Sequence, residues 1–339
     1  MKVAVVMPVY NSERYLFEAI NSILSQTYRN FTLVAVDDGS TDGSLQLLKN
    51  AALVDERMVV LAQQNKGVSA ARNLALEYLE ASGDFDLLCF FDSDDVVYPD
   101  FLETYVRLKE RYDADYIVSG FFRWFKHSKI QNEDSRGESY FLEGLESLSH
   151  FSGDSGLRKL APEASSNLLA HRCFSSSVVY GMRFRQDLRV CEDQEFILRA
   201  LLKVKRGVLS RRVTYLYRQR GRSLSRDVAG VDSEIKFMRL LFRMYESGNE
   251  KLKQVLLLYV VRLWWATVRK VYENDLAKEY KEDLRKIFYK IKKCGEVQSL
   301  PKRYAKRIFI CGFGEMVLCC YFWVASFRKK RGGNQEVFE

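Results

Sequence analysis

Short apolar runs alternate with amphipathic stretches along the first third of the chain. Each run is long enough for a buried strand, and the residues after it place apolar side chains at helical spacing. The four runs are Lys2–Met7, Phe31–Val36, Met58–Ala62 and Leu87–Phe91. Strands and helices that alternate in this way predict a parallel sheet with helices on both faces.

The rest of the chain changes character twice. Asp115–Phe122 predicts a fifth strand, the polar stretch Lys126–Glu138 predicts a loop, and Glu143–Phe151 predicts a helix. Beyond Asp227, three segments carry apolar residues at helical spacing with Glu and Lys between them. They are Ile235–Tyr245, Leu252–Tyr272 and Leu276–Ile291. This pattern predicts a small helical bundle.

The fourth apolar run ends on a dense acidic cluster of Asp92, Asp94 and Asp95. Like charges this close together repel one another unless a cation neutralises them. Ligands of open α/β sheets bind at the carboxyl ends of the strands, and ligand sets made only of oxygen suit Mg²⁺ or Mn²⁺. A cation site is therefore expected here, with a solvated turn that caps the next helix as the alternative.

Polar groups also follow the first two predicted strands. Because the carboxyl ends of parallel strands lie along one edge of the sheet, these groups are expected to share one crevice. Tyr10 could stack there on a base, and Asp38 could accept a hydrogen bond from a uracil N–H. Lys66 or Arg72 could reach a phosphate. Together these groups predict a nucleotide site.

A second acidic pair, Glu192 and Asp193, opens an amphipathic stretch that continues through Phe196 and Leu201. The helix dipole at such a position favours ionised carboxylates. The pair is a second candidate site, and ordinary first-turn acids of a helix are the alternative.

Four motifs, in this order and spacing, resemble those of the family 2 glycosyltransferases of the GT-A fold. They are Pro8–Asn11, Val36–Asp42, Asn65–Asn73 and Asp92–Asp95. The resemblance is close over residues 1–120 and looser to residue 226. It implies an α/β GT-A fold, which is a Rossmann-like, mostly parallel sheet flanked by helices, with a C-terminal helical extension. The transferase domain would occupy residues 1–226, with a nucleotide-sugar-binding half at 1–120 and an acceptor half at 121–226, before a helical region at 227–339.

The resemblance also implies an inverting, metal-dependent transfer of a hexosyl or N-acetylhexosaminyl group. The donor would be a nucleotide-diphosphate sugar, usually a UDP-sugar, and the acceptor a saccharide or lipid-linked saccharide in bacterial surface polysaccharide biosynthesis. Asp193, beside Glu192, matches the catalytic base. Asp94, with Asp92, matches the ligands of Mn²⁺ or Mg²⁺. Donor-binding positions are Pro8, Val9, Tyr10, Asn11, Glu13, Asp38, Lys66, Arg72, Asp92, Ser93 and Asp94.

Four further residues are candidates for contacts with the diphosphate or the acceptor. They are Asp95, Arg218, Arg222 and Arg226. For the three arginines a solvated basic loop is an equal alternative.

Other classes of protein fit part of the pattern. A nucleotidyltransferase shares the acidic metal ligands but usually has a Gly-rich loop where this chain has Pro8–Asn11. A non-catalytic nucleotide-sugar-binding module would bind UDP and a metal without transfer or hydrolysis, and the intact pair Glu192 and Asp193 counts against it. A nucleic-acid binder is disfavoured because the expected crevice is acidic.

The net charge of +9 is divided unevenly. Residues 1–100 carry 7 Lys and Arg against 15 Asp and Glu, and the remainder carries 46 basic and 29 acidic residues. The basic part could face an anionic membrane or a phosphorylated acceptor. Seven scattered cysteines without a C-x-x-C pair indicate reduced thiols, and the start of the chain lacks the features of a secretory signal. We therefore expect a cytoplasmic protein held peripherally at the inner face of the cell membrane.

The last apolar segment, Ile308–Phe327, is flanked by basic residues within the range 302–331. It is long enough to span a bilayer, but Gly312, Gly314 and Glu315 interrupt it. The favoured prediction is a helix that lies in the membrane interface. A helix packed on the protein or on a partner in a homodimer, and a true membrane span, are the alternatives.

Overall fold

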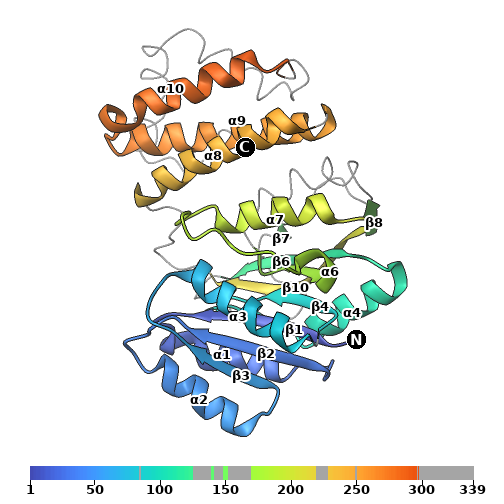
Figure 1. Ribbon diagram of the computed structural model, residues 1–339. Helices are drawn as coiled ribbons and strands as arrows, with labels where there is room; N and C mark the ends of the chain where they lie inside the picture. The colour runs from blue at the N-terminus through green and yellow to red at the C-terminus, as the bar shows by residue number, and fades with distance from the viewer. Residues whose placement is uncertain are drawn as a thin grey trace. The chain divides into compact units, whose positions relative to one another are not determined.

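The computed structural model describes residues 1–83, 85–124, 139–140, 148–151, 169–218, 228–248, 250–295 and 297. The chain forms two compact units, Met1–Arg222 and Ser223–Glu339 (Figure 1). This division lies within a few residues of the domain boundary suggested at residue 226. The candidate site belongs to the first unit.

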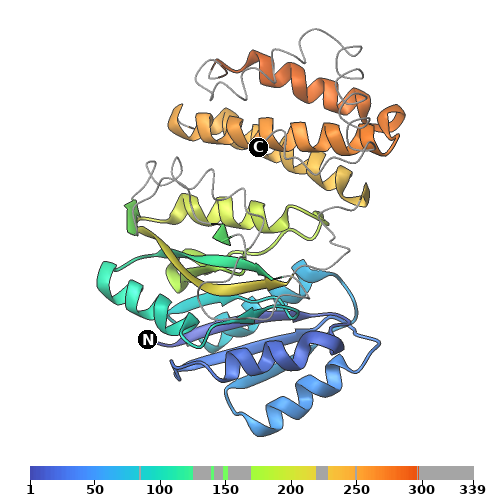
Figure 2. The same ribbon diagram turned by 180° about the vertical axis from the view of Figure 1, so that it is seen from behind.

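The first unit begins with strands and helices in strict alternation. The strands are β1 (Val3–Val9), β2 (Phe31–Asp37), β3 (Met58–Ala62) and β4 (Leu87–Phe90). The helices are α1 (Glu13–Leu24), α2 (Ser44–Val54), α3 (Val68–Ser82) and α4 (Phe101–Tyr112). The strands pair in parallel, as predicted, and their order in the sheet is β3-β2-β1-β4. Right-handed crossovers place α1 and α2 on one face and α3 on the other, which the opposite views of Figures 1 and 2 show.

Beyond β4 the sheet becomes mixed. Strand β9 (Arg172–Ser175) lies antiparallel between β4 and β6 (Tyr116–Trp124). Strand β10 (Gly207–Arg218) then runs parallel to β6, and the short β5 (Val96–Val97) closes the order. The short helix α6 (Ser176–Val179) follows β9, and α7 (Glu192–Lys203) precedes β10. The chain therefore leaves the acidic cluster after β4 and returns to the same sheet on β9 and β10.

One predicted helix is wrong where the structure describes it. Leu148–Phe151, the end of the expected helix Glu143–Phe151, forms β8 and pairs antiparallel with β10. Pairing with a long neighbouring strand decides the conformation of such a short segment, and local periodicity does not contain that information. The two-residue strand β7 (Ser139–Tyr140) pairs with β6. The loop predicted at 126–138 lies outside the described residues.

The core of the first unit follows the predicted apolar pattern. All seven residues of β1 and all four of β4 are buried. Helix α1 buries Leu16, Ala19, Ile20 and Ile23, so the face expected from the sequence packs on the sheet. Because β1 and β4 are neighbours at the centre of the sheet, the loops that follow them are held on a rigid base.

The second unit contains a short 3₁₀ turn, η2 (Val228–Gly230), and the three predicted helices. They are α8 (Val231–Ser247), α9 (Glu250–Glu273) and α10 (Ala277–Lys293). The indole N–H of Trp264 donates to the carbonyl of Leu284 at 2.8 Å, and its ring stacks on Phe288. Within the parts of the chain described here, no helix combines the length and the apolarity that crossing a membrane requires. The segment Ile308–Phe327 lies outside those parts.

Candidate active site

The loops after β1, β2 and β4 meet at the carboxyl edge of the parallel strands, and serine hydroxyls join them. The Ser12 and Ser93 hydroxyls lie 2.7 Å apart in a buried hydrogen bond. The backbone N–H of Ser12 donates to Ser44 Oγ at 2.9 Å, and that of Asn11 donates to Ser40 Oγ at 3.1 Å. Hydrogen bonds thus connect three segments that are far apart in the sequence.

The start of α1 holds the loop after β2 through side-chain acceptors. Asn11 adopts a left-handed φ of 48°, which Asn tolerates well, and its Oδ1 accepts the N–H of Thr41 at 2.8 Å. Glu13 Oε2 accepts the N–H of Gly43 at 2.9 Å. A Cβ at Gly43 would lie 2.5 Å from the Glu13 carboxylate, so a larger residue there would displace the end of the Glu13 side chain. Glu13 is therefore engaged with the loop, while Tyr10 is half exposed.

Asp38 is buried and organises the turn that enters α3. Its Oδ1 accepts the side-chain amide of Gln63 at 2.7 Å and the N–H of Lys66 at 2.9 Å, and its Oδ2 accepts the N–H of Gly67 at 2.9 Å. A carboxylate offers about four acceptor positions, so these bonds leave one for a ligand. Oδ1 of the neighbouring Asp37 is buried and accepts no hydrogen bond from the described residues. Nothing in the sequence indicated this buried oxygen.

Arg72, on α3, is the centre of the site. Its guanidinium is 2.6 Å from Asp193 Oδ1, 3.4 Å from Asp92 Oδ1 and 3.6 Å from Glu192 Oε1. The Arg72 side chain is 4% exposed and lies 5.2 Å from the ring centroid of Phe184. The structure thus brings together the two acidic sites that the sequence placed about 100 residues apart, through a residue expected only to reach a phosphate.

Three carboxylates share this single guanidinium, and the pKa values of two of them, Asp193 and Glu192, are raised. Burial raises the pKa of Asp193 to about 8; Arg72 opposes this shift, and Glu192 and Asp92 add to it. Burial also raises the pKa of Glu192 above its ordinary value. A carboxylate with a raised pKa is a stronger base than an exposed one, as proton abstraction requires.

Asp95 does not face the crevice. It is fully buried, and it accepts the Tyr215 hydroxyl at 2.6 Å and the N–H of Arg218 at 2.8 Å. The Arg218 side chain donates to the carbonyl of Asp94 at 2.6 Å and to Glu18 at 2.6 Å. These contacts attach the end of β10 to the acidic loop, which corrects the expectation that Asp95 contacts a ligand directly. The other two candidates, Arg222 and Arg226, lie outside the described residues.

An aromatic cluster that the sequence did not reveal supports the centre of the site. Phe184 stacks on Phe196 with ring centroids 4.1 Å apart, and both meet Phe90 edge to face. Phe90 ends β4 just before the acidic loop, and Phe196 lies one helical turn after Asp193. The cluster therefore fixes α7 against β4. Phe196 was recognised only as part of an amphipathic face, and Phe184 carried no local signal.

Cys191 precedes the acidic pair in a strained conformation, and we predict that Cys191→Gly stabilises the protein. Its φ of 68° lies in the left-handed region, which a residue with a Cβ adopts at a penalty of about 1–2 kcal/mol. Glycine removes that penalty but loses about 0.5–1 kcal/mol of chain entropy. We expect a net gain of up to about 1 kcal/mol in the urea-induced unfolding free energy. Cys191→Val should lower it, and equal stabilities of the two variants would contradict the prediction.

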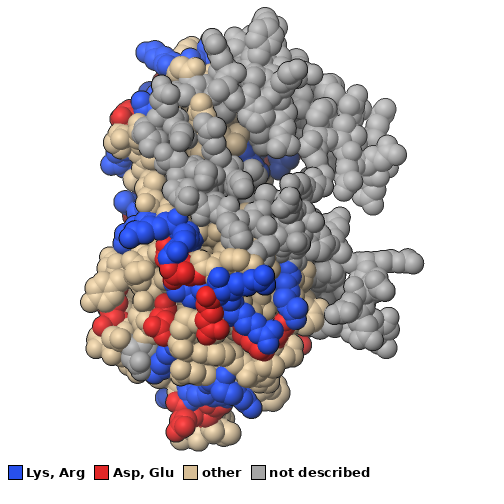
Figure 3. Space-filling view, turned by 90° about the vertical axis from the view of Figure 1, so that its right-hand side faces the viewer, with Lys and Arg blue, Asp and Glu red and all other residues tan. Residues whose placement is uncertain are grey.

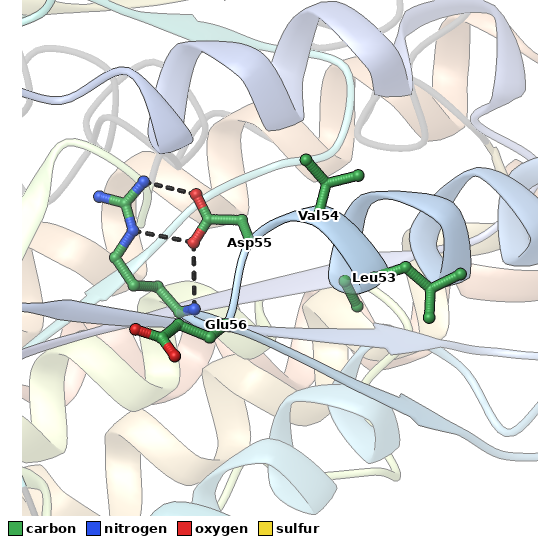
Figure 4. Close-up of a pocket in the computed structure, with 6 residues that line it drawn as sticks. Leu53, Val54, Asp55 and Glu56 are labelled. Carbon is green, nitrogen blue, oxygen red and sulfur yellow. Dashed lines mark hydrogen bonds and ion pairs between the residues drawn. The ribbon is translucent and has the colours of Figure 1, made fainter.

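A shallow pocket lies elsewhere on the unit, where α2 ends and β3 begins (Figure 4). It is lined by Ala52, Leu53, Val54, Asp55, Glu56 and Arg57. The amino end of β3 is at the edge of the sheet opposite the Arg72 cluster, and Asp55 already binds Arg57 at 2.9 Å. Because ligands of such sheets bind at the carboxyl ends of the strands, this pocket is not the candidate active site.

Charged side chains of both signs lie side by side on one face of the molecule (Figure 3). Figure 3 shows basic side chains in blue directly beside acidic ones in red on one face. Arg185 and Asp187 form such an exposed pair of opposite charges. Their side chains are 2.9 Å apart, and both are more than one third exposed. Exposed pairs contribute about 0–1 kcal/mol each, whereas the Arg72 cluster is largely screened from water.

Residues 4–166 match the sequence profile described as glycosyl transferase family 2. This part of the chain belongs to that family. Glycosyltransferase GlyA of Streptococcus pneumoniae serotype 4 is 36% identical over 150 residues, which are 44% of this chain and 21% of GlyA. Glycosyltransferase GlyG of the same organism is 35% identical over 140 residues, which are 41% of this chain and 42% of GlyG. The chain therefore matches less than half the length of either relative.

Solved structures show the same fold over most of the chain. The crystal structure of Staphylococcus aureus TarS 1–349 in complex with UDP-GlcNAc aligns with a TM-score of 0.69 at 20% identity, covering 90% of this chain and 83% of that one. A Pyrobaculum calidifontis mannosyltransferase in complex with GDP-Man and Mn²⁺ aligns with a TM-score of 0.54 at 13% identity, covering 98% of this chain and 88% of that one. The predicted GT-A fold is confirmed.

Proposed function

We propose that this family 2 chain is an inverting glycosyltransferase that uses a nucleotide-diphosphate sugar, specifically a UDP-sugar with a hexosyl or N-acetylhexosaminyl group. One observation carries the proposal: Asp92 of the Asp92–Asp95 motif and the candidate base Asp193 meet at the Arg72 guanidinium, at the carboxyl edge of the parallel strands. The glycosyltransferase relatives and the complex of TarS with UDP-GlcNAc support it.

The proposed reaction is a single in-line displacement at the anomeric carbon of the donor. Asp193 accepts the proton of an acceptor hydroxyl while that oxygen forms the new bond to the anomeric carbon. The bond from the sugar to the diphosphate breaks on the opposite face, and the nucleotide leaves with both electrons. Arg72 holds the Asp193 carboxylate at 2.6 Å, which fixes its position for the attack.

The acidic residues of the site are suited to a divalent cation that would also contact the phosphates of the donor. Asp92, Glu192 and Asp193 place three acidic groups around one guanidinium, so the cluster carries an excess of negative charge. Mg²⁺ is usually held by one or two carboxylates together with the phosphates of the substrate. Asp94 and Asp92 would hold the cation. When bound, it would stabilise the charge that develops on the leaving diphosphate.

The remaining donor contacts belong to the same proposal. Tyr10 is half exposed and would stack on the uracil of the donor. The Asp38 carboxylate has one acceptor position left, which would accept the N–H of the uracil. The acceptor is proposed to be a saccharide or lipid-linked saccharide used in bacterial surface polysaccharide assembly at the inner face of the membrane. The basic composition beyond residue 100 supports an anionic or phosphorylated acceptor.

The pH dependence of the reaction should report the raised pKa of Asp193. A base must be deprotonated to accept a proton, and this pKa of about 8 lies above the ordinary value of 3.8. We therefore expect kcat/KM for the acceptor to rise with pH through the range 7–9. The profile is measured at saturating donor and metal. A profile that is flat from pH 5 to 9 would exclude a base with this pKa.

The direct test is a panel of nucleotide sugars. Thermal unfolding and nucleotide release are measured with UDP-glucose, UDP-galactose, their N-acetylated forms, GDP-mannose and dTDP-rhamnose, each with and without Mn²⁺. We expect a UDP-sugar to raise the melting temperature when Mn²⁺ is present and to release UDP slowly. Asp94→Ala should lose the Mn²⁺-dependent stabilisation. Binding without any release, even with saccharide acceptors, would favour a non-catalytic binding module, and no response to any donor would reject the proposal.

A further inference from the structure

Helix α10, orange in Figure 1, carries charges of both signs in its first half and only basic ones in its second. The first half contains the acids Glu279, Glu282 and Asp283 together with Lys278 and Lys281. From residue 285 to residue 293 the chain has five basic residues and no acidic one. They are Arg285, Lys286, Lys290, Lys292 and Lys293, and all five are exposed. We call these five residues with Tyr289 the α10 basic face.

Packing keeps this basic face turned away from the bundle. Leu284, Ile287 and Ile291 are buried against the other helices of the second unit, and the five basic residues between and after them are exposed. Of these, Lys290 also reaches back to α8, where its ammonium lies 5.5 Å from the ring centroid of Phe242. Tyr289 lies in the middle of the basic face and is 51% exposed. The Arg285 guanidinium lies 5.8 Å from the Tyr289 ring centroid. An aromatic ring with an apolar body and a polar tip is suited to the boundary between water and lipid.

The helix dipole accounts for only part of this pattern. Cations are favoured in the last turn of a helix, and Lys290, Lys292 and Lys293 lie there. Arg285 and Lys286 lie more than one turn further back, where the effect of the dipole has faded. Lys286 pairs with Glu282 at 3.7 Å, and both side chains are 67% exposed. The positive charges of Arg285 and Lys286 are therefore not explained by stabilisation of the helix.

We propose that the α10 basic face docks the protein on an anionic lipid surface. Clustered lysines and arginines are attracted to acidic headgroups by about 1 kcal/mol each, which is roughly fivefold in partitioning per charge. The exposed face of a helix is convex, so these charges can contact a flat lipid surface. In the sequence, the apolar, aromatic-rich segment Ile308–Phe327 follows soon after α10, which favours a lipid surface over a nucleic acid as the partner.

The test uses the full chain and sedimentation with phosphatidylcholine vesicles that contain about 30% phosphatidylserine. The variant Lys286→Gln/Lys290→Gln/Lys293→Gln should bind roughly 100-fold more weakly than the parent chain at about 0.1 M NaCl. The matched control Lys236→Gln/Arg243→Gln/Arg269→Gln removes the same charge from exposed positions on α8 and α9. The affinity of this control for the vesicles should fall by less than about fivefold. Circular dichroism melts check that both variants fold.

Three results would overturn the proposal. If both variants lost vesicle affinity equally, net charge alone would explain binding. If the α10 variant bound the vesicles as tightly as the parent chain, the membrane contact would lie elsewhere in the chain. Binding to single-stranded RNA that depends on α10, without binding to the vesicles, would identify a nucleic-acid surface. Donor release by the α10 variant in solution should equal that of the parent chain, so failure of this proposal and failure of the proposed transferase activity are distinguishable.

Discussion

Asp193→Asn should lower kcat for glycosyl transfer by about 10²–10⁴-fold while the affinity for the donor is retained. The amide has the shape of the carboxylate and its oxygen can still accept the Arg72 N–H, which is 2.6 Å from Asp193 Oδ1 in the parent chain. It cannot take a proton from an acceptor hydroxyl. Turnover is measured with the donor identified by the nucleotide-sugar panel, and donor affinity by calorimetry in the presence of Mn²⁺.

A matched control is available six residues earlier in the chain. Asp187→Asn makes the same chemical change in an exposed ion pair with Arg185, so it should leave kcat within about twofold. If Asp193→Asn also retained near-normal turnover, Asp193 would not be the base. If it lost donor binding as well, its role would be to hold the donor site together.

The first half of the fold was predictable because its signals are local. Each strand from Val3 to Phe90 is a continuous apolar run, and buried parallel strands have this pattern. Prediction failed where pairing partners decide the structure. The strand Leu148–Phe151 depends on its antiparallel partner β10, and the insertion of β9 between β4 and β6 is a long-range contact. No local periodicity records such contacts.

The candidate site was predictable as a set of residues but not as an arrangement. The acidic motifs were recognised from their position after predicted strands and from the family resemblance. Their connection through Arg72 was not, because Arg72 and Asp193 are 121 residues apart in sequence. The burial of Asp95 was equally hidden, since Tyr215 and Arg218 reach it from the last strand of the sheet. Sequence patterns identify charged residues, whereas burial decides which of them face a ligand.

Arg72→Met should destabilise the protein strongly as well as inactivate it. The methionine keeps an apolar contact with Phe184 but leaves Asp193, Glu192 and Asp92 without their shared cation. Removing one partner of a buried ion pair has an effect of about 3–5 kcal/mol, and the 33% exposure of Asp92 places the expected loss near about 3 kcal/mol. The measurement is the free energy of unfolding in urea at pH 9, above the pKa of about 8 of Asp193, where this carboxylate is ionised. Arg185→Met, which breaks an exposed pair, should change it by less than about 1 kcal/mol.

The pH dependence of that loss separates an electrostatic role from a packing role. Without Arg72 the pKa of Asp193 should rise further above its ordinary value, because burial and the neighbouring acids already raise it and the opposing cation is gone. A folded-state pKa above the unfolded value gives stability that is present at low pH and is lost as the pH rises. The difference in unfolding free energy between the parent chain and Arg72→Met should therefore be smaller at pH 5 than at pH 8. A difference that stays constant across this range would mean that Arg72 acts by packing on Phe184, and that the three carboxylates do not depend on its charge.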